Sequence, residues 1–375
     1  MNGLVIELVV TEECNLGCTY CYMDNKPVYM TRETLWDLHR NMDVFLKLYR
    51  KDTYEVSFFG GEPTLNWDLI EYAVPLFAQD PRCDHQIIIS NGLLLTEEKI
   101  SWLHQNHCGI SMSFDGLWNN INRPLKNGTG SLDVYLKKRD LFHRMGIRGS
   151  KTMVGPASVS TMLENFKFLV DEYGFPTPDF TLVRDDIWSW DDVESFKENL
   201  TPLTDEIISR FEQGNPNTVG FFHLMLLDIF LATRLGKRSM GCFSGCGGIG
   251  VLPDGVVYPC ARYGSEKKYP IFDLKTGTLY EKNIATVSAP SVCNPIAYSG
   301  CVGCDIRLYC NGGCNKSFFA KGDYIKAEPI PQLCALYKTI VSETLRIHKT
   351  LKNNPTYKTY IKQSVTPYLT GANNG

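Results

Sequence analysis

The sequence of 375 residues has no long apolar run, no marked excess of charge and no secretory start. Its most apolar stretch, residues 221–232, is shorter than the roughly 20 residues of a membrane helix and contains His223 and Asp228, so we expect a buried helix and no membrane partner. With 38 Lys+Arg against 41 Asp+Glu the net charge is −3, which gives no reason to expect a nucleic-acid partner. The N-terminus lacks a basic segment followed by a small-residue cleavage site, so we expect a cytoplasmic protein.

Several common catalytic motifs are also absent. The sequence contains no phosphate-binding Lys loop, no His-Glu-x-x-His and no nucleophile elbow. Residues 245–250 match Gly-x-Gly-x-x-Gly, but no clear strand precedes them, so we interpret the match as a coincidence. These absences argue against a P-loop nucleotidase, a zincin protease and an α/β-hydrolase.

Cysteine is abundant, with 14 residues. Three lie at positions 14, 18 and 21, two at positions 83 and 108, and nine after position 241. In a long chain without an export signal, cysteines at this density are metal ligands more often than disulfides. Two clusters at opposite ends therefore indicate two kinds of metal site.

The first half alternates β-rich runs with amphipathic stretches, which predicts a parallel α/β sheet with helices outside. Periodicity does not separate an open doubly wound sheet from a barrel, and we favour a partial barrel on the motifs described below. The expected strands are residues 4–10, 55–59, 86–90, 110–114, 147–153 and 179–183, and the expected helices are residues 31–50, 66–78, 96–107, 131–145 and 160–173.

The composition changes after about residue 236. Gly, Pro and Cys become frequent, a hairpin is expected at residues 250–258, and helical periodicity returns only at residues 333–351. We therefore predict two domains, residues 1–236 and 237–375, with a frayed tail at 371–375.

Cys14, Cys18 and Cys21 form a Cys-x3-Cys-x2-Cys motif directly after the first expected strand. Three thiolates can bind three irons of a 4Fe–4S cluster and leave the fourth iron open, as a catalytic metal requires. A structural zinc loop with a distant fourth ligand is the alternative.

The motif resembles that of the radical S-adenosylmethionine (SAM) superfamily, Cys-x3-Cys-x-aromatic-Cys, with Tyr20 as the aromatic residue. Further matches follow successive strands, where ligands bind in parallel α/β folds. The matching residues are Gly60-Gly61-Glu62-Pro63, Ser90-Asn91-Gly92, Ser113-Phe114-Asp115-Gly116 and the downstream Arg123. The resemblance implies a partial (β/α)6 TIM-like barrel in which Glu62 accepts hydrogen bonds from the SAM amino group and the Asp115 segment lies near the ribose. Tyr20, Gly60, Gly61, Glu62, Ser90, Ser113, Asp115 and Arg123 are the predicted cofactor-binding residues.

What the resemblance implies for chemistry is that SAM chelates the open iron. An electron from the cluster then cleaves SAM to methionine and a 5′-deoxyadenosyl radical, which removes a substrate hydrogen.

The C-terminal cysteines closely resemble a SPASM domain, the extension of radical SAM enzymes that modify peptides and proteins, which carries two auxiliary 4Fe–4S clusters. By position, the first would take Cys242, Cys246, Cys260 and Cys314, and the second would take Cys301, Cys304, Cys310 and Cys334. Zinc ribbons and disulfides are the alternatives, and Cys83, Cys108 and Cys293 remain as ordinary thiols.

The resemblance implies an oxidoreductase that installs a crosslink, an epimerised residue or an oxidised side chain in a peptide, with a flavodoxin- or ferredoxin-type electron donor. Anaerobic sulfatase maturation by formylglycine formation is the alternative, but Ala261 follows Cys260 where those enzymes carry an aspartate. An iron–sulfur electron carrier and a zinc-binding interaction protein are further alternatives. No catalytic base is assigned.

Residues 171–194 hold eight acidic side chains, Trp188 and Trp190, and one basic residue, Arg184. Two interpretations stay open at this point. The segment is either a solvated acidic loop with packing tryptophans or a docking lip for a basic or aromatic peptide segment.

Overall fold

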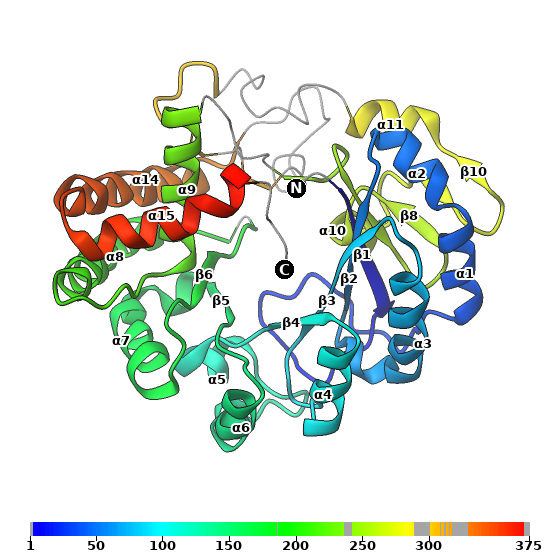
Figure 1. The fold of residues 1–375 in the computed structure, drawn as a ribbon, viewed down its shortest axis with the longest axis horizontal. Coiled ribbons are helices and arrows are strands. Elements are labelled where there is room, and N and C mark those ends of the chain that lie inside the picture. The colour runs from blue at the N-terminus through cyan, green and yellow to red at the C-terminus, as the bar shows by residue number, and fades with distance from the viewer. Residues whose placement is uncertain are drawn as a thin grey trace.

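The computed structural model describes residues 3–185, 187–235, 242–288, 301–307, 309–310, 313–314, 316 and 329–370. Within these residues the chain forms a partial barrel with helices outside it, and the second half of the chain continues the barrel sheet (Figure 1). The expected tail at 371–375 and Cys293 lie outside the described residues.

Six parallel strands form the barrel wall. Four of them pair in the order β1-β2-β3-β4, and β5 pairs with β6. A bridge between Ser113 and Lys151, with the Phe114 N–H 3.1 Å from the Lys151 carbonyl oxygen, joins β4 to β5. The parallel α/β fold predicted from the sequence is thereby confirmed. The strands are β1 (Leu4–Thr11), β2 (Tyr54–Gly60), β3 (Cys83–Ser90), β4 (Cys108–Met112), β5 (Lys151–Val154) and β6 (Asp179–Leu182).

Successive side chains of each strand point to opposite faces, one towards the outer helices and the next towards the barrel interior. Ile6 and Leu8 of β1 are fully buried in the core, whereas Glu7 between them lies on the opposite face. The helices of this half are α1 (Arg32–Arg40), α2 (Met42–Tyr49), α3 (Trp67–Ala78), α4 (Glu97–Gln105), α5 (Asn119–Asn122), α6 (Leu132–Arg144) and α7 (Met162–Lys167).

Three expected elements differ clearly from the prediction. The helix expected at 160–173 divides into α7 and a π-helix over Phe168–Tyr173. The helix expected at 31–50 is broken at Asn41. Both the backbone N–H and the side-chain amide of Asn41 donate to the Asp37 carbonyl, the amide at 2.8 Å, and so end the first helix. The strand expected at 147–153 begins at Lys151, because pairing with β6 starts there, with Lys151 opposite Asp179.

After residue 242 the chain returns to the barrel sheet. β7 runs parallel to β1 on the side opposite β2, so β1 is an interior strand, and the expected hairpin is present as the antiparallel pair of β7 and β8. This part contains β7 (Gly248–Val251), β8 (Val256–Tyr258), α10 (Ala261–Ser265), β9 (Phe272–Asp273), β10 (Thr278–Leu279) and α11 (Glu281–Val287).

A group of long helices closes the other side of the molecule (Figure 1). The predicted buried helix at 221–232 is confirmed as part of α9, and the periodic stretch near residue 340 is confirmed as α14. None of the helices in the described residues is both long and apolar enough to cross a lipid bilayer. The group consists of α8 (Trp190–Glu212), α9 (Gly220–Leu235), α14 (Pro331–Leu351) and α15 (Pro355–Thr370).

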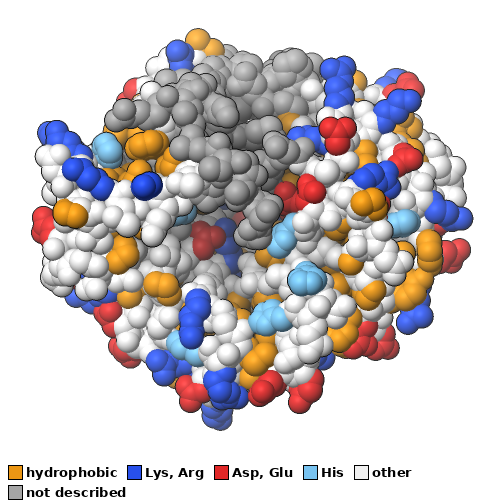
Figure 2. Space-filling model, viewed as in Figure 1, with side chains coloured by type: hydrophobic (Ala, Val, Ile, Leu, Met, Phe, Trp, Pro, Cys, Tyr) orange, Lys and Arg blue, Asp and Glu red, His pale blue; other side chains and the backbone are white. Residues whose placement is uncertain are grey.

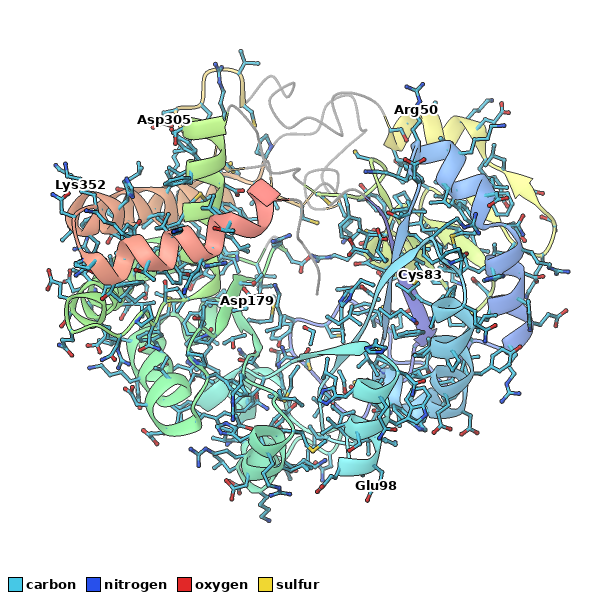
Figure 3. All side chains as sticks on the ribbon, in the orientation of Figure 1. Arg50, Cys83, Glu98, Asp179, Asp305 and Lys352 are labelled. Atoms are coloured by element: carbon cyan, nitrogen blue, oxygen red, sulfur yellow. The ribbon has the colours of Figure 1, made fainter. Side chains whose placement is uncertain are left out.

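A hollow opens at the centre of the ring of elements, with acidic and basic side chains inside it (Figure 2). Beside it, where β4 and β5 separate below their single bridge, lies a cavity of about 480 Å³. Lys151 and Asp179 line this cavity and form a salt bridge of 2.8 Å. Figure 3 marks the position of Asp179.

A buried carboxylate ties the end of α3 to β2 and β3. Asp80, 8% exposed, accepts hydrogen bonds from the Tyr54 hydroxyl at 3.0 Å and from the Arg82 backbone and guanidinium at 2.8–2.9 Å. The hydrogen bonds from Arg82 lower the pKa of Asp80 below its ordinary value. The stabilisation is therefore present at neutral pH and is lost as the pH falls below the unfolded-state pKa of about 3.9 towards the folded-state value.

We expect Asp80→Asn to lower the free energy of unfolding by about 2 kcal/mol at pH 7, because bonds to a charged acceptor are lost. Urea unfolding at pH 7, 5 and 3.5 measures this difference, which should narrow only at the lowest pH. The exposed Asp84 provides a control, with Asp84→Asn expected within about 0.5 kcal/mol of the wild type. An equal effect of both substitutions would contradict the proposed role of Asp80.

Candidate functional site

The Cys14–Cys21 loop leaves the carboxyl end of β1 and is held on two sides. Leu16 is buried and forms a bridge with Leu125, and the Gly17 N–H donates to the Pro124 carbonyl at 2.8 Å. The Cys14 N–H donates to the Asn25 side chain at 2.8 Å. The loop conformation is thus fixed by protein contacts rather than by the thiols.

The surroundings of Cys14 and Cys18 do not stabilise the deprotonated, negatively charged form of their thiols. Burial raises the pKa of Cys14 to about 11, although the Leu16 N–H donates a hydrogen bond to its sulfur. Burial likewise raises the pKa of Cys18 to about 12, although the positive charge of Arg123 acts in the opposite direction. Bound iron would supply the missing positive charge, since metal ligation deprotonates a thiol. No group of three or more His, Cys, Asp or Glu in the described residues converges as ligands of one metal ion do. Each cysteine of a 4Fe–4S cluster binds a different iron, so that finding does not test the cluster prediction.

Glu62 lies directly behind this loop and is 1% exposed. Its Oε1 accepts bonds from the Thr64 N–H, the Thr64 hydroxyl and the Ser90 hydroxyl at 2.5–3.1 Å, and its Oε2 accepts from the Asn91 N–H at 2.7 Å. Burial raises the pKa of Glu62, and the largest opposing contributions come from hydrogen bonds of uncharged groups, Thr64, Asn91 and Ser90. A buried carboxylate with one lightly used oxygen fits a ligand ammonium group.

The glycines before Glu62 are required by the cysteine loop itself. A Cβ on Gly60 would lie 2.1 Å from the Thr11 carbonyl oxygen, and one on Gly61 would lie 2.2 Å from that of Glu13. The Gly61 and Glu62 N–H groups donate to these two carbonyls at 2.9 and 2.8 Å. The sequence interpretation placed a ligand against these glycines, whereas the close neighbour is the backbone that leads to Cys14.

We expect Gly61→Ala to lower the free energy of unfolding by about 1–3 kcal/mol, because an added methyl group forces two hydrogen-bonded backbones apart. Chemical denaturation of the metal-free protein measures the loss. Gly149→Ala is the matched control, because no atom lies within 4 Å of a Cβ there. Equal stability of the two variants would show that a side chain at position 61 can be accommodated beside the Glu13 backbone.

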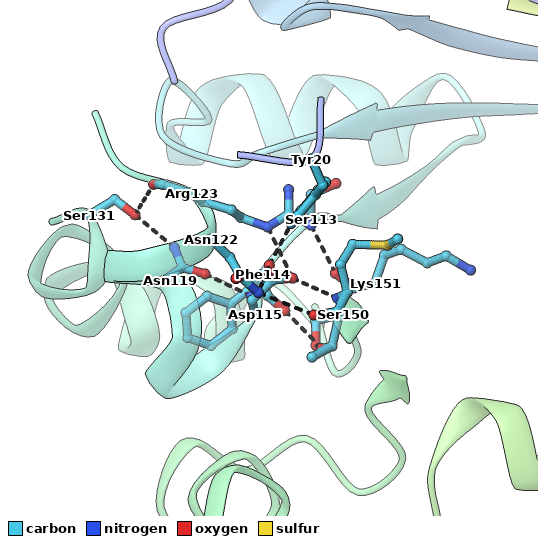
Figure 4. Close-up of polar contacts among 12 residues, drawn as sticks. Tyr20, Ser113, Phe114, Asp115, Asn119, Asn122, Arg123, Ser131, Ser150 and Lys151 are labelled. Carbon is cyan, nitrogen blue, oxygen red and sulfur yellow. Dashed lines mark hydrogen bonds and ion pairs between the residues drawn. The ribbon is translucent and has the colours of Figure 1, made fainter. Parts of the chain in front are cut away.

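Asp115 joins Tyr20 and Arg123, two of the other predicted cofactor residues, into one network (Figure 4). Its Oδ2 accepts from the Tyr20 hydroxyl at 2.8 Å and from Asn122 at 3.1 Å, and its Oδ1 lies 2.8 Å from the Met153 N–H and 3.0 Å from Arg123 Nε. Both oxygens are thus occupied by protein donors. Asp115 orients Tyr20 and Arg123, and its carboxylate is not available for a direct ligand contact in this conformation.

Ser90 and Ser113 form hydrogen bonds to other parts of the protein. The Ser90 hydroxyl is used on Glu62, and the Ser113 N–H donates to the Ser90 carbonyl at 2.8 Å. Arg123 lies over the Tyr20 ring, 5.4 Å from its centre, within reach of a cation–π contact. Tyr20, Glu62 and Arg123 are therefore the predicted residues best placed to meet a ligand.

A second polar group inside the barrel is not among the residues predicted from the sequence. Glu7 Oε2 accepts the Ala261 N–H at 2.7 Å, and the Arg262 guanidinium lies 5.0 Å from the centre of the Tyr22 ring and pairs with Asp185. This group connects Tyr22, which follows Cys21, with Ala261 and Arg262, which follow Cys260. One signal was available, since Glu7 is a charged residue in the otherwise apolar run Leu-Val-Ile-Glu-Leu-Val-Val.

The described cysteines of the C-terminal array fall into two neighbourhoods. Burial, and then the charges of Glu7, Cys242 and Cys314, raise the pKa of Cys260, so these thiols lie close enough to interact. Burial, and then Cys301 and Cys304, raise the pKa of Cys334. Cys310, Cys314 and Cys334, which come from both predicted ligand sets, also line one small cavity, so the division into two ligand sets stays a prediction.

Three cysteines need separate mention. Cys246 is disulfide-bonded in the structure, and in that state its sulfur is not a thiolate ligand. Cys83 and Cys108, predicted to be ordinary thiols, are free and lie half-buried and buried at the starts of β3 and β4.

The acidic segment is not a uniform loop. Trp188 is 4% exposed and donates its indole N–H to the Val183 carbonyl at 2.8 Å, while Trp190 begins α8 and is 55% exposed. Asp185 is paired with Arg262, and Asp171 with Arg210. Of the tryptophans in the proposed docking lip, only Trp190 is free to meet a partner.

Comparisons with known proteins agree with this geometry. The family model described as the Radical SAM superfamily matches residues 8–169, which run from β1 to the π-helix that follows α7. The radical SAM cyclopropyl synthase TigE of Paramaledivibacter caminithermalis is 22% identical over 369 residues, covering 92% of this chain and 75% of that protein. The PqqA peptide cyclase of Bradyrhizobium diazoefficiens is 23% identical over 391 residues, covering 97% of this chain and 95% of that protein.

A solved structure, native anSMEcpe with bound AdoMet and Cp18Cys peptide, has the same fold. It superposes with a TM-score of 0.73 at 21% identity and covers 94% of this chain and 99% of its own. The cysteine loop, the buried Glu62 and the family match coincide on the same strands. The chain therefore carries a radical SAM domain, the domain that defines the radical SAM superfamily.

Proposed function

We propose that the protein is a radical SAM/SPASM enzyme that removes a hydrogen atom from a peptide substrate and so installs a modification. The observation that carries this proposal is Glu62, a buried carboxylate whose hydrogen-bond partners in the described residues are uncharged groups, directly behind a three-cysteine loop. A radical SAM domain implies one 4Fe–4S cluster and SAM, which together supply one-electron cleavage of SAM and removal of a substrate hydrogen.

In this proposal the chain's own residues bind and orient the cofactors. Cys14, Cys18 and Cys21 hold the cluster, and Glu62 Oε2 accepts from the SAM ammonium group. The Ser90 hydroxyl and the Asn91 N–H fix the Glu62 carboxylate for that contact. Tyr20, oriented by Asp115, presents its ring to the ligand.

The C-terminal half holds two auxiliary 4Fe–4S clusters in the proposal, which makes three clusters in all. Cys242, Cys246, Cys260 and Cys314 form the first set, and this requires Cys246 as a thiolate rather than in its disulfide. Cys301, Cys304, Cys310 and Cys334 form the second set. The proposed division into a barrel at 1–236 and a SPASM domain at 237–375 is kept, although the sheet runs through both.

A peptide substrate is supported by the relatives, which include a peptide cyclase and a fold neighbour determined with a bound peptide. The modification is a crosslink, an epimerisation or a side-chain oxidation, and a flavodoxin- or ferredoxin-type protein is the proposed electron donor. Formylglycine formation on a sulfatase is the alternative, and it is disfavoured because Ala261, which has no proton-accepting side chain, follows Cys260.

Metal and product analysis after anaerobic reconstitution tests the proposal. We expect about 12 irons per chain, negligible zinc, and release of 5′-deoxyadenosine that depends on SAM and a low-potential reductant. Zinc in place of iron would identify a zinc-binding interaction protein. Iron without deoxyadenosine release would identify an electron carrier, and either result would refute the enzyme.

A further inference from the structure

Strand β4 has a neighbouring strand on one edge only over most of its length. Within the described residues it is the last strand of its sheet and pairs with β3 over Cys108–Met112. It reaches β5 only at the bridge between Ser113 and Lys151, two residues drawn in Figure 4. A free strand edge presents unpaired N–H and C=O groups that can pair with another extended segment. The free edge of β4 lies within the barrel wall, where β4 and β5 separate.

The direction of the backbone identifies the free groups. The Ser113 N–H donates to β3 at 2.8 Å, and the Phe114 N–H donates to β5 at 3.1 Å. Because successive N–H groups of a strand point to opposite edges, the N–H and C=O groups of Ile110 and Met112 face the β5 side. Within the described residues no strand pairs with them there, and no other backbone group is bonded to them on that side.

The cavity of about 480 Å³ provides space for a further strand beside these groups. It is lined by Ile110 on one side and by residues 146–151 on another, and its volume falls within the range of ligand sites, about 300–1,000 Å³. Ile110 and Ile147 join it to the apolar core, whereas Ser111 and the salt-bridged Asp179 are polar. Since side chains of an added strand alternate between two faces, a peptide of alternating polarity fits this cavity.

The charges around the cavity favour an acidic peptide. Arg148 and Lys151 bring two positive charges to its lining and Asp179 brings one negative charge. Arg148 forms no salt bridge in the part of the chain that the structure describes, so its charge is available to a ligand carboxylate. One end of the cavity meets the predicted cofactor residues, because the Lys151 carbonyl accepts from the Arg123 guanidinium at 3.4 Å.

We propose that the free edge of β4 binds an extended, acidic segment of the peptide substrate by strand addition. The inference rests on the proposed function, because it takes a peptide as the substrate. Main-chain hydrogen bonds to Ile110 and Met112 supply affinity, and the two faces of the cavity select alternate side chains. From this edge the peptide continues past Lys151 towards the residues proposed to hold the cofactor.

The probe is a synthetic pool of acetylated octapeptides in which valine alternates with aspartate, serine or lysine. The pool is equilibrated with the reconstituted full-length protein, and retained peptides are identified by mass spectrometry. We expect aspartate to be enriched over lysine, and hydrogen–deuterium exchange of residues 108–114 to slow on binding.

The best-retained peptide is then methylated at one backbone nitrogen at a time. Methylation should lower affinity about tenfold or more at every second position, where the peptide N–H faces β4, and less at the positions between. This period of two is the signature of strand addition, and it requires no change in the protein.

Two variants test the protein side. Ile110→Pro removes one N–H of the free edge. Proline is tolerated where a strand N–H faces away from its neighbour, so β4 should still pair with β3 while peptide affinity falls about tenfold. Arg148→Gln should reduce the preference for aspartate about threefold. Arg144→Gln is the matched control, because Arg144 lies on α6, pairs with Glu97 and does not line the cavity.

Uniform effects of methylation, unchanged exchange at residues 108–114, or undiminished affinity in Ile110→Pro would overturn the inference, and the methylation series decides alone if that variant does not fold. An aspartate preference unchanged in Arg148→Gln would overturn the choice of an acidic peptide. A wild-type dimer that Ile110→Pro dissociates would show that a second copy covers the edge, which also overturns the inference. No retained peptide, with 5′-deoxyadenosine still released, would overturn the inference and leave the proposed function intact. Absence of deoxyadenosine release would refute the proposed function, and peptide retention would still decide whether the edge binds peptides.

Discussion

Replacing Cys14 by alanine is expected to lower the iron content from about 12 to about 8 per chain and to abolish 5′-deoxyadenosine release. The remaining two thiols of the loop, Cys18 and Cys21, can bind only two of the irons, so we expect the cluster not to be retained. Inductively coupled plasma analysis gives the iron count, and chromatography of the quenched reaction gives the nucleoside.

The chain offers a close control for that substitution. Cys83 is another half-buried free thiol, but it lies at the start of β3, away from the cysteine loop, so Cys83→Ala should retain both iron and deoxyadenosine release. If Cys14→Ala kept all its iron and still released deoxyadenosine, the loop would not be the catalytic cluster site and the proposed function would fail.

The second large effect is expected for Glu62→Gln, which should weaken SAM binding by about 10- to 100-fold. A hydrogen bond to a charged partner contributes about 1.5–3 kcal/mol, and the amide removes the charge that would meet the SAM ammonium group. Isothermal titration of the reconstituted protein with SAM, without reductant, measures affinity separately from turnover.

A folding effect must be separated from this loss. The amide NH₂ of the new Gln side chain must face either the Asn91 N–H or the group of donors on Oε1, so we expect a stability cost of about 1 kcal/mol. Ser90→Ala removes one of those donors and leaves the charge, and it should weaken SAM binding by less than about tenfold. Equal SAM affinities for Glu62→Gln and the wild type would exclude Glu62 as the ammonium acceptor.

Much of the barrel could be predicted because its signals are local. The apolar strands and the residues that follow them lie next to one another in the sequence, and parallel strands bring their carboxyl ends to one edge. The sequence alone therefore predicts that Cys14, Glu62 and Ser90 are neighbours. The break at Asn41 and the late start of β5 depend on single backbone conformations, which hydrophobic periodicity does not report.

The roles of individual side chains are harder to predict than their proximity. Asp115 is expected near a ligand from the sequence. In the structure its carboxylate accepts hydrogen bonds from Tyr20, Asn122 and the Met153 N–H and forms an ion pair with Arg123. Gly61 is predicted to bind the cofactor, and the structure adds that its lack of a side chain leaves room for the Glu13 backbone. Long-range hydrogen bonds of this kind have no period in the sequence, so only the folded arrangement reveals them.

The pairing of β1 with both β2 and β7 has a consequence for how the chain can be divided. A polypeptide ending near residue 236 would leave one edge of β1 without its neighbour, and β1 is an apolar strand of eight residues. An uncovered apolar edge is a template for pairing between molecules. The isolated first half is thus expected to aggregate rather than to remain a dispersed protein, and the two halves are best regarded as one folding unit.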